Sequence, residues 1–455
     1  PLITRDEAGL PEPCLAESWE MQDDGKVWIF RLRRNVYFQN GTQFNADSVI
    51  ANFDRMKKGL KRSNFYSLSL ALYYPSLISY EKLDEYTVRL VFKEPNINQL
   101  YKMTDFGSPM FAPECFDANG DFKDIAIGTG PYKITKNVMN KYVVLKCNDN
   151  YWGEKGKIKD FVVRNIPNTD TRYAALKSGE IDGVLDLNAP PPPFLADEIK
   201  KDKRFAVASN KSTMIRYLAL NNSRFPFNDV RMRQAVSLAI DRKNLVDALY
   251  MGYAEPTMNV LNYTSPGYKE FPLEHNLAKA KQLAHEVLGD KRCDVTYCIN
   301  GAEPLQKGEA ELIAYWLGKI GLDVHIQSLE YATRAKMLRK GDYDIARLQK
   351  GLANGDPYEV LNSFLMPTGS IYISSHTGYQ NKELQGLMQE VKHTVDAKER
   401  QRIFDRVQEI AVEEEPLVAL FNDMNIVAYN KRLKNYKPLI YGVDLSKVEL
   451  AEKYD

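Results

Sequence analysis

The chain alternates between stretches whose hydrophobic residues recur at every second position and stretches whose hydrophobic residues recur at helical spacing. Residues 27–33 follow the first pattern and place Trp28, Phe30 and Leu32 on one face, which predicts a strand. The stretch after Asn45, a candidate N-cap, follows the second pattern and predicts a helix. The first part of the chain therefore combines strands with helices.

The same succession continues toward the C-terminus. Residues 161–166 predict a strand, a helix that ends at Gly179 follows, and another strand starts at Ile181. In the second half, predicted strands at 295–299 and 324–326 alternate with helices. Strand–helix–strand order is typical of folds in which helices cover a sheet. We therefore predict the α/β class.

A distinct junction lies near the middle of the chain. The apolar run at residues 217–220 stops at Asn221 and Asn222. We expect a helix to begin shortly afterwards, at Asn228 or Asp229, because either side chain can accept a hydrogen bond from the first helical turn.

Acidic and basic residues nearly cancel. The 455 residues include 61 Lys and Arg against 60 Asp and Glu, which gives a formal net charge of +1. This length is sufficient for two or three domains. The balanced charge provides no overall field that would attract nucleic acid or an anionic membrane, so we predict no nucleic-acid partner.

Neither cysteine spacing nor hydrophobicity indicates a zinc site or a membrane span. The five cysteines lack zinc-type spacing, and Cys293 and Cys298 lie on opposite faces of a predicted strand, so they cannot form a disulfide with each other. No apolar run reaches the roughly 20 residues of a membrane helix. The chain begins at Pro1 without a signal peptide, which is typical of a mature or trimmed product.

The sequence carries no recognisable catalytic or nucleotide-binding motif. The glycine-rich turn at residues 127–132 lacks the Lys-Ser/Thr ending of a phosphate loop and precedes a strand instead of a helix. GxSxG, HExxH and an acid pair near a histidine are also missing from the sequence. We therefore predict that the protein is not an enzyme; a hydrolase is the rival class, and turnover of peptides or glycosides would support it.

Several blocks occur together in an order that resembles the extracytoplasmic solute-binding proteins of the peptide/nickel class, which serve ATP-driven importers. The blocks cover nearly the whole chain and lie at residues 15–19, 38–44, 128–132, 150–153 and 217–235. The resemblance implies a type II, two-lobed periplasmic-binding-protein-like fold with a ligand cleft between the lobes.

The resemblance also implies the lobe boundaries of the chain and its partner in transport. The first lobe would comprise residues 1–215 and 430–455, with an inserted subdomain at about 35–140, and the second lobe residues 216–429. No catalysis and no intrinsic cofactor are implied. The implied partner is the membrane permease of an ABC importer, and the implied protein is a monomer, periplasmic or lipid-anchored at the cell surface. A sensor that presents the loaded receptor to a membrane partner is an alternative role.

The residues around the Asn-Gly-Asp-Pro turn bear on the ligand. In dipeptide-binding members of the class, a carboxylate before this turn pairs with the peptide amine. Ala353 takes that position here, which disfavours a dipeptide held in this way unless Asp356 replaces the carboxylate. Residues 150–172 resemble the nickel-binding branch, which binds a metal chelate. We therefore predict a nickel (or related transition metal) chelate as the ligand, with a di- or oligopeptide as the alternative.

The nickel-binding branch suggests contacts in the first lobe. Arg62 falls where the branch has a carboxylate-binding arginine, and Phe65 takes the place of its stacking tryptophan. Tyr66 is a second aromatic candidate. A guanidinium can bind a carboxylate through two hydrogen bonds. The alternatives are a basic helix surface for Arg62 and a small core for the two aromatic residues; the second arginine of the branch has no counterpart near Asp105.

Four candidates belong to the second lobe. Arg347 would lie near the carboxyl end of a predicted strand, the end that faces the ligand crevice in α/β sheets. Asp356 and Tyr358 follow on the next loop, although Asp356 alternatively shapes the turn. His376 is the candidate metal ligand, because imidazole binds nickel and copper well. The alternative for His376 is a lone surface histidine.

Overall fold

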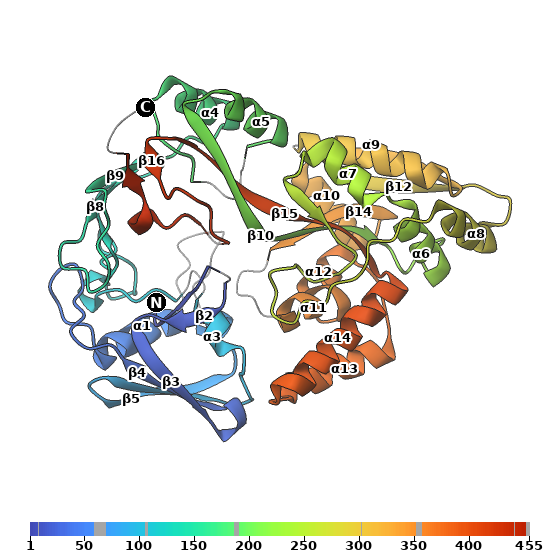
Figure 1. Cartoon of the computed structure of the whole chain (residues 1–455). Coiled ribbons are helices and arrows are strands. Elements are labelled where there is room, and N and C mark those ends of the chain that lie inside the picture. The colour runs from blue at the N-terminus through green and yellow to red at the C-terminus, as the bar shows by residue number, and fades with distance from the viewer. Residues whose placement is uncertain are drawn as a thin grey trace. The chain divides into compact units, whose positions relative to one another are not determined.

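The contacts of the chain divide it into two units. The computed structural model describes residues 1–7, 9–58, 70–104, 108–185, 191–301, 303–351, 357–440 and 442–451 (Figure 1). Unit 1 comprises Pro1–Asn210 and Asn425–Asp455, and unit 2 comprises Lys211–Met424. The strands β10 (Phe205–Leu220) and β15 (Leu417–Asn430) run through the two boundaries. The boundaries therefore fall inside continuous strands and precede the predicted limits at 215/216 and 429/430.

An antiparallel four-stranded sheet with the order β3-β4-β6-β5 forms the first part of unit 1. Its strands are β3 (Ala16–Gln22), β4 (Val27–Leu32), β5 (Leu77–Asp84) and β6 (Thr87–Phe92). Trp28, Phe30 and Leu32 are buried, so the strand predicted from alternation is confirmed. The helix α1 (Ala46–Lys58) packs on the same core, and Asn45 Oδ1 caps it by accepting from the Ser48 N–H at 3.2 Å. This sheet starts ahead of the predicted subdomain limit at about residue 35.

The second part of unit 1 is a three-stranded antiparallel sheet followed by helices. The elements are β7 (Tyr132–Val138), β8 (Tyr142–Cys147), β9 (Asp160–Arg164), α4 (Thr169–Ser178) and α5 (Pro193–Lys201). Gly179 ends α4 with a φ of 80°, a conformation that glycine adopts without strain, so the predicted helix end is confirmed. The short elements of unit 1 are β1 (Ile3–Arg5), β2 (Pro11–Pro13), α2 (Leu70–Tyr73), α3 (Gln99–Lys102), β16 (Leu433–Lys434), β17 (Glu449–Leu450) and 3-10 turns at Asp23–Gly25, Pro113–Cys115 and Leu445–Lys447.

Unit 2 is built on a six-stranded mixed sheet with the order β11-β15-β10-β14-β12-β13. The further strands are β11 (Ala254–Pro256), β12 (Cys293–Asn300), β13 (Leu322–Leu329) and β14 (Ile345–Gly351). β12 is parallel to both β13 and β14, so the carboxyl ends of these three strands lie at one edge of the sheet. The apolar residues that follow α14 form one continuous strand, β15, which is buried along most of its length.

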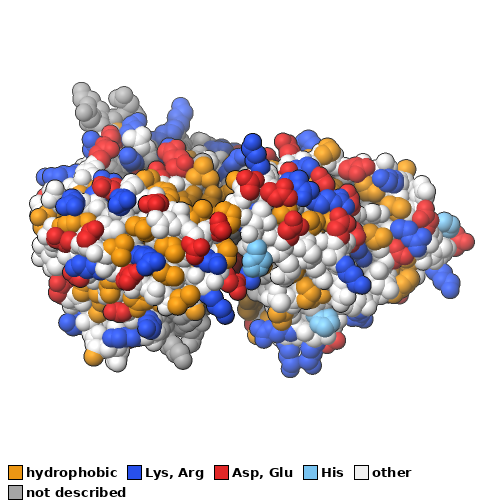
Figure 2. Space-filling model, turned by 90° about the horizontal axis from the view of Figure 1, so that it is seen from below, with side chains coloured by type: hydrophobic (Ala, Val, Ile, Leu, Met, Phe, Trp, Pro, Cys, Tyr) orange, Lys and Arg blue, Asp and Glu red, His pale blue; other side chains and the backbone are white. Residues whose placement is uncertain are grey.

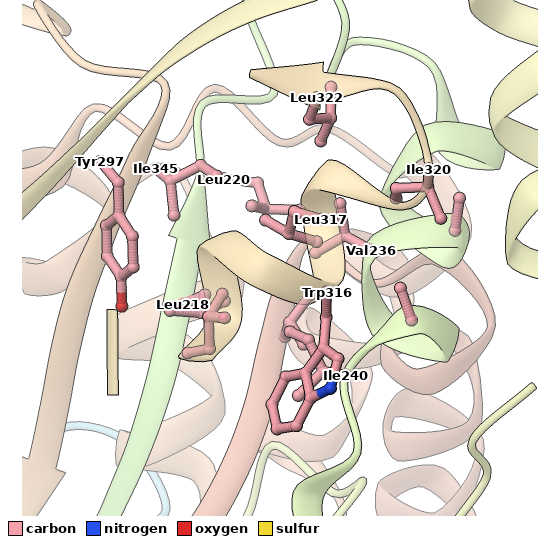
Figure 3. Close-up of a cluster of buried hydrophobic side chains, with 14 of the residues drawn as sticks. Leu218, Leu220, Val236, Ile240, Tyr297, Trp316, Leu317, Ile320, Leu322 and Ile345 are labelled. Atoms are coloured by element: carbon pink, nitrogen blue, oxygen red, sulfur yellow. The ribbon is translucent and has the colours of Figure 1, made fainter. Parts of the chain in front are cut away.

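Helices cover both faces of this sheet, which confirms the predicted α/β class. One core contains residues of α6 (Val230–Ala239), α7 (Arg242–Tyr250), α8 (Leu277–Leu288) and α9 (Pro304–Gly318). The opposite core contains residues of α10 (Tyr331–Lys340), α11 (Pro357–Leu365), α13 (Lys382–His393) and α14 (Ala397–Glu414), with α12 (Ser370–Ser375) packed against it. Figure 3 shows side chains of the first core, where Leu218 and Leu220 of β10 meet Trp316 and Leu317 of α9.

The central junction folds as the sequence indicates. Leu218 and Leu220 enter one core while Tyr217 and Ala219 enter the other, as expected when successive residues of a strand point to opposite faces. Asp229 caps α6 by accepting from the Arg231 N–H at 2.9 Å, which confirms one of the two predicted helix starts.

Two further expectations concern cysteines and membranes. All five cysteines are free thiols, so the prediction that Cys293 and Cys298 do not bridge is confirmed. None of the helices in the described ranges combines the length and apolarity that crossing a bilayer requires. On the face seen in Figure 2, acidic and basic side chains are interspersed, which fits the balanced net charge.

Candidate functional site

The predicted ligand contacts fall into two groups. Arg62, Phe65, Tyr66 and Asp356 lie outside the described residues. Arg347, Tyr358 and His376 are described, and the three belong to unit 2.

Arg347 lies on β14 and is part of the core of unit 2. Its side chain is 1% exposed, as is that of Glu309 on α9. Arg347 Nε donates to Glu309 Oε2 at 2.7 Å, Nη2 donates to Oε1 at 3.2 Å, and Nη1 donates to the Leu348 carbonyl at 3.0 Å. We therefore correct the prediction: Arg347 is the buried partner of Glu309, because β14 is covered on both faces and its residues from Ile345 to Leu348 are all buried.

The electrostatics of this pair follow from its burial. Burial disfavours the charged guanidinium, but the attraction of Glu309 is strong enough to raise the pKa of Arg347 above its ordinary value. The Tyr250 hydroxyl also donates to Glu309 Oε1. Glu309 thus accepts hydrogen bonds from the buried Arg347 and the half-buried Tyr250, and it neutralises Arg347.

Tyr358 lies on α11 and His376 at the end of α12, and these two helices contact each other. Tyr358 is half-buried on α11 and packs against the core beneath it. His376 ends α12 with a φ of 46° and is exposed. Its ring lies over Gly341, since a Cβ at Gly341 would be 2.8 Å from His376 Cδ2.

The asparagines of the central junction hold the segment that carries His376. Asn221 Nδ2 donates to the carbonyls of Gly341 and Tyr343, at 3.1 Å each. The Asn222 N–H donates to the Thr377 carbonyl at 2.8 Å. The junction therefore fixes both the turn under the imidazole and the residue after it.

We expect Gly341→Ala to displace the His376 ring. Gly341 has a φ of 71°, and the new methyl group would overlap His376 Cδ2. The left-handed conformation alone should destabilise unit 2 by about 1 kcal/mol. Urea unfolding and the chemical shifts of the His376 ring measure the two effects. Gly386→Ala, on the open surface of α13, is the control; equal imidazole shifts in both variants would contradict the contact.

Within the described ranges, no three His, Cys, Asp or Glu side chains lie together as a metal-binding set. A metal held by His376 would therefore need its remaining ligands from a chelator. The imidazole of His376, at the end of α12, would supply one nitrogen ligand.

Two cavities lie among the described residues of unit 1. One, of about 720 Å³, lies along β9 and the segment after α4, and the other, of about 600 Å³, has charged walls near β1 and β17. Neither is lined by a described residue that the sequence predicts to contact the ligand. The described cavities therefore do not coincide with the predicted contacts.

Sequence reasoning missed two charged residues near Arg347. Glu309 is fully buried on α9, and Arg334 is 9% exposed on α10. A signal for Arg334 exists in the sequence: it precedes Leu338 by one helical turn, so it shares the buried face of α10. A charged residue on an apolar helix face is a candidate for a specific role.

Comparisons with known proteins agree with this architecture. A model of the bacterial extracellular solute-binding proteins, family 5 middle region, matches residues 11–371. Heme-binding protein A of Haemophilus influenzae is 27% identical over 95% of this chain and 83% of its own length. The probable D,D-dipeptide-binding periplasmic protein of Escherichia coli is 27% identical over 93% and 82%. The crystal structure of NikA from Brucella suis with Fe(III)-EDTA has a TM-score of 0.86 and 25% identity, covering 99% of this chain and 93% of that one.

Proposed function

Since the chain belongs to the bacterial extracellular solute-binding proteins of family 5, we propose that it is an importer receptor whose ligand is a short peptide. Members of this family bind small solutes and work with the membrane permease of an ABC importer. The relatives are substrate-binding transport proteins and not enzymes.

The observation that supports a peptide ligand is the similarity to the probable D,D-dipeptide-binding protein, at 27% identity over 93% of this chain. A dipeptide-binding protein of Escherichia coli is 26% identical over the same share. Ala353 still disfavours an amine held by a carboxylate before the turn. The peptide would therefore be recognised through its backbone and its C-terminus.

A nickel or related transition-metal chelate is the second candidate. It is favoured by the exposed His376 and by the similarity to NikA with Fe(III)-EDTA. We place it second because the matched curated relatives include proteins named for dipeptides.

Calorimetry with three ligands separates the candidates: Ni²⁺ alone, Ni²⁺ with free histidine, and a pool of di- and tripeptides. A peptide receptor binds the pool without metal, and His376→Ala leaves that affinity within about twofold. A chelate receptor binds only when histidine is present, and His376→Ala weakens binding at least about tenfold, because a metal ligand is lost. His393→Ala, at the end of α13, is the matched control.

The remaining assignments are proposals that rest on the family. We propose that the protein is a monomer, periplasmic or lipid-anchored at the cell surface. We also propose that Tyr358 contacts the ligand from unit 2, and that His376 does so as a metal ligand if the solute is a chelate. Arg62, Phe65, Tyr66 and Asp356 keep their proposed role as further contacts, outside the described residues.

A further inference from the structure

The most exposed large apolar side chain among the described residues lies at the tip of a β-hairpin in unit 1. Met139 is 76% exposed, between the end of β7 and the start of β8. The Lys141 N–H donates to the Val138 carbonyl at 2.9 Å and closes the turn. Asn165 Nδ2 donates to the Asn140 carbonyl at 3.3 Å. A hydrogen-bonded turn therefore presents an apolar side chain to the solvent.

The hairpin is rich in positive charge. Residues 133–148 contain no Asp or Glu and four lysines, which are Lys133, Lys136, Lys141 and Lys146. Lys146 Nζ lies 3.9 Å from Asp160 Oδ1, and among the described residues no acidic side chain pairs with the other three lysines. Although the whole chain has a net charge of +1, this segment is therefore strongly basic.

The pairing of β7, β8 and β9 places lysines around apolar side chains. Val138 is paired with Tyr142, and Tyr142 is paired with Arg164 on the next strand. Directly paired residues point to the same face of a sheet, and so do alternate residues of one strand. One face therefore carries the apolar residues Val138, Tyr142, Val144 and Val162, the cations Lys133, Lys136, Lys146 and Arg164, and the acid Asp160.

The apolar part of this face is open to the solvent and lies next to unpaired ammonium groups. Val162 is 60% exposed. Lys136 Nζ lies 5.3 Å from the centre of the Tyr142 ring, so a positive charge and an aromatic ring stand together. Arg164 is paired with Glu180 at 2.6 Å, which balances its charge within the protein. The unbalanced positive charge is therefore concentrated at the hairpin.

Proteins that rest on a membrane surface use this combination of side chains. Apolar and aromatic groups enter the interface, and lysine or arginine side chains extend their charged ends to the lipid headgroups. Each cation near an anionic bilayer adds to the attraction, and salt screens it. A bilayer also adapts its shape to a protruding tip, whereas a protein partner would need an acidic hollow matched to Met139. The hairpin therefore fits an anionic lipid surface.

We propose that the β7–β8 hairpin binds the surface of an anionic bilayer, with Met139 in the headgroup region and Lys136 and Lys141 on the lipid phosphates. The contact is reversible, because a few cations and one apolar side chain bind a bilayer more weakly than a lipid anchor with a second membrane signal does. It goes beyond the proposed ligand and does not depend on whether the solute is a peptide or a chelate. It would keep the receptor at the membrane that holds its permease.

The test is sedimentation of the 455-residue protein with lipid vesicles. Vesicles of phosphatidylcholine with about one third phosphatidylglycerol should bind the protein at least about tenfold more tightly at low salt than phosphatidylcholine alone, since only they carry a net negative charge. About 0.5 M NaCl should abolish the difference. Lys136→Gln combined with Lys141→Gln should weaken binding to the anionic vesicles at least about tenfold.

The matched control removes two lysines from another surface. Lys336 and Lys340 are exposed on α10 of unit 2, so Lys336→Gln combined with Lys340→Gln changes the net charge equally. This variant should keep the wild-type affinity for anionic vesicles to within about twofold. Equal binding by the two double variants overturns the proposal, as does a wild type that does not bind the anionic vesicles. Tighter binding to soluble polyglutamate than to these vesicles would assign the hairpin to an acidic protein and also overturns it.

A second measurement tests whether the tip enters the bilayer. The tryptophan emission added by Met139→Trp should move to shorter wavelength with anionic vesicles, because the indole leaves water. Met251→Trp, at a site 50% exposed in unit 2, is the control and should not respond. Urea midpoints equal to that of the wild type verify that both variants are folded. An emission of Met139→Trp that stays unchanged overturns the placement of the tip in the headgroup region.

Discussion

Replacing Glu309 with alanine is expected to lower the free energy of unfolding of unit 2 by about 3–5 kcal/mol, because it leaves a buried charge without its partner. Glu309 is fully buried and accepts from Arg347 Nε at 2.7 Å. Without it, Arg347 and Arg334 would be two adjacent positive charges in the core. Urea unfolding followed by circular dichroism measures the loss.

The control is Glu311→Ala on the same helix. Glu311 is exposed and lies 3.9 Å from Lys307, so its removal should change stability by about 0.5 kcal/mol or less. Combining Glu309→Ala with Arg347→Met should recover part of the loss, since the unpaired charge then disappears as well. A loss below about 1 kcal/mol for Glu309→Ala would show that the pair contributes little.

The stability of the wild type relative to Glu415→Gln is expected to fall by about 3 kcal/mol as the pH rises from about 4.5 to about 7. Glu415 is 3% exposed at the end of α14, and it accepts from Ser237 Oγ at 2.6 Å. Burial raises the pKa of Glu415 from 4.5 to about 7, although Arg242, Ser237 and Arg233 act in the opposite sense.

The direction follows from proton binding. Between these two pH values the folded protein holds a proton on Glu415 that the unfolded chain has already lost, so stability decreases as the pH rises. The contribution is fully present below about pH 4.5 and is gone above about pH 7. Unfolding at a series of pH values measures the difference between the two proteins. Glu413 is the control, because its side chain is 61% exposed: the stability of Glu413→Gln should depend on pH as that of the wild type does. If the stability of Glu415→Gln also followed the wild type at every pH, the Glu415 carboxyl would be ionised over the whole pH range.

The two predictions concern interactions with different origins in the sequence. Glu309 and Arg347 are 38 residues apart in the sequence. Glu415, by contrast, is the residue that immediately follows α14 and caps its C-terminal end. Local pattern therefore suggests a helix end near Glu415, but nothing in the sequence pairs Glu309 with Arg347.

The sequence by itself determined the local elements and the family. Alternating hydrophobic residues defined β4, the Asp229 cap defined the start of α6, and Gly179 defined the end of α4. These signals suffice because each acts over a few residues: a strand face, a capping oxygen or a left-handed glycine needs no distant partner. The ordered blocks added the family, which the match over residues 11–371 shows.

Only the tertiary structure decided which charges are neutralised. The strand pattern placed Arg347 near the carboxyl end of β14. It did not show that helices cover both faces of the sheet, or that Glu309 of α9 pairs with Arg347. The same packing left the buried Nε of Arg334 without a hydrogen-bond partner among the described residues. Hydrophobic periodicity reports which side of an element is buried, whereas the partner of a buried charge depends on elements brought together from distant parts of the chain.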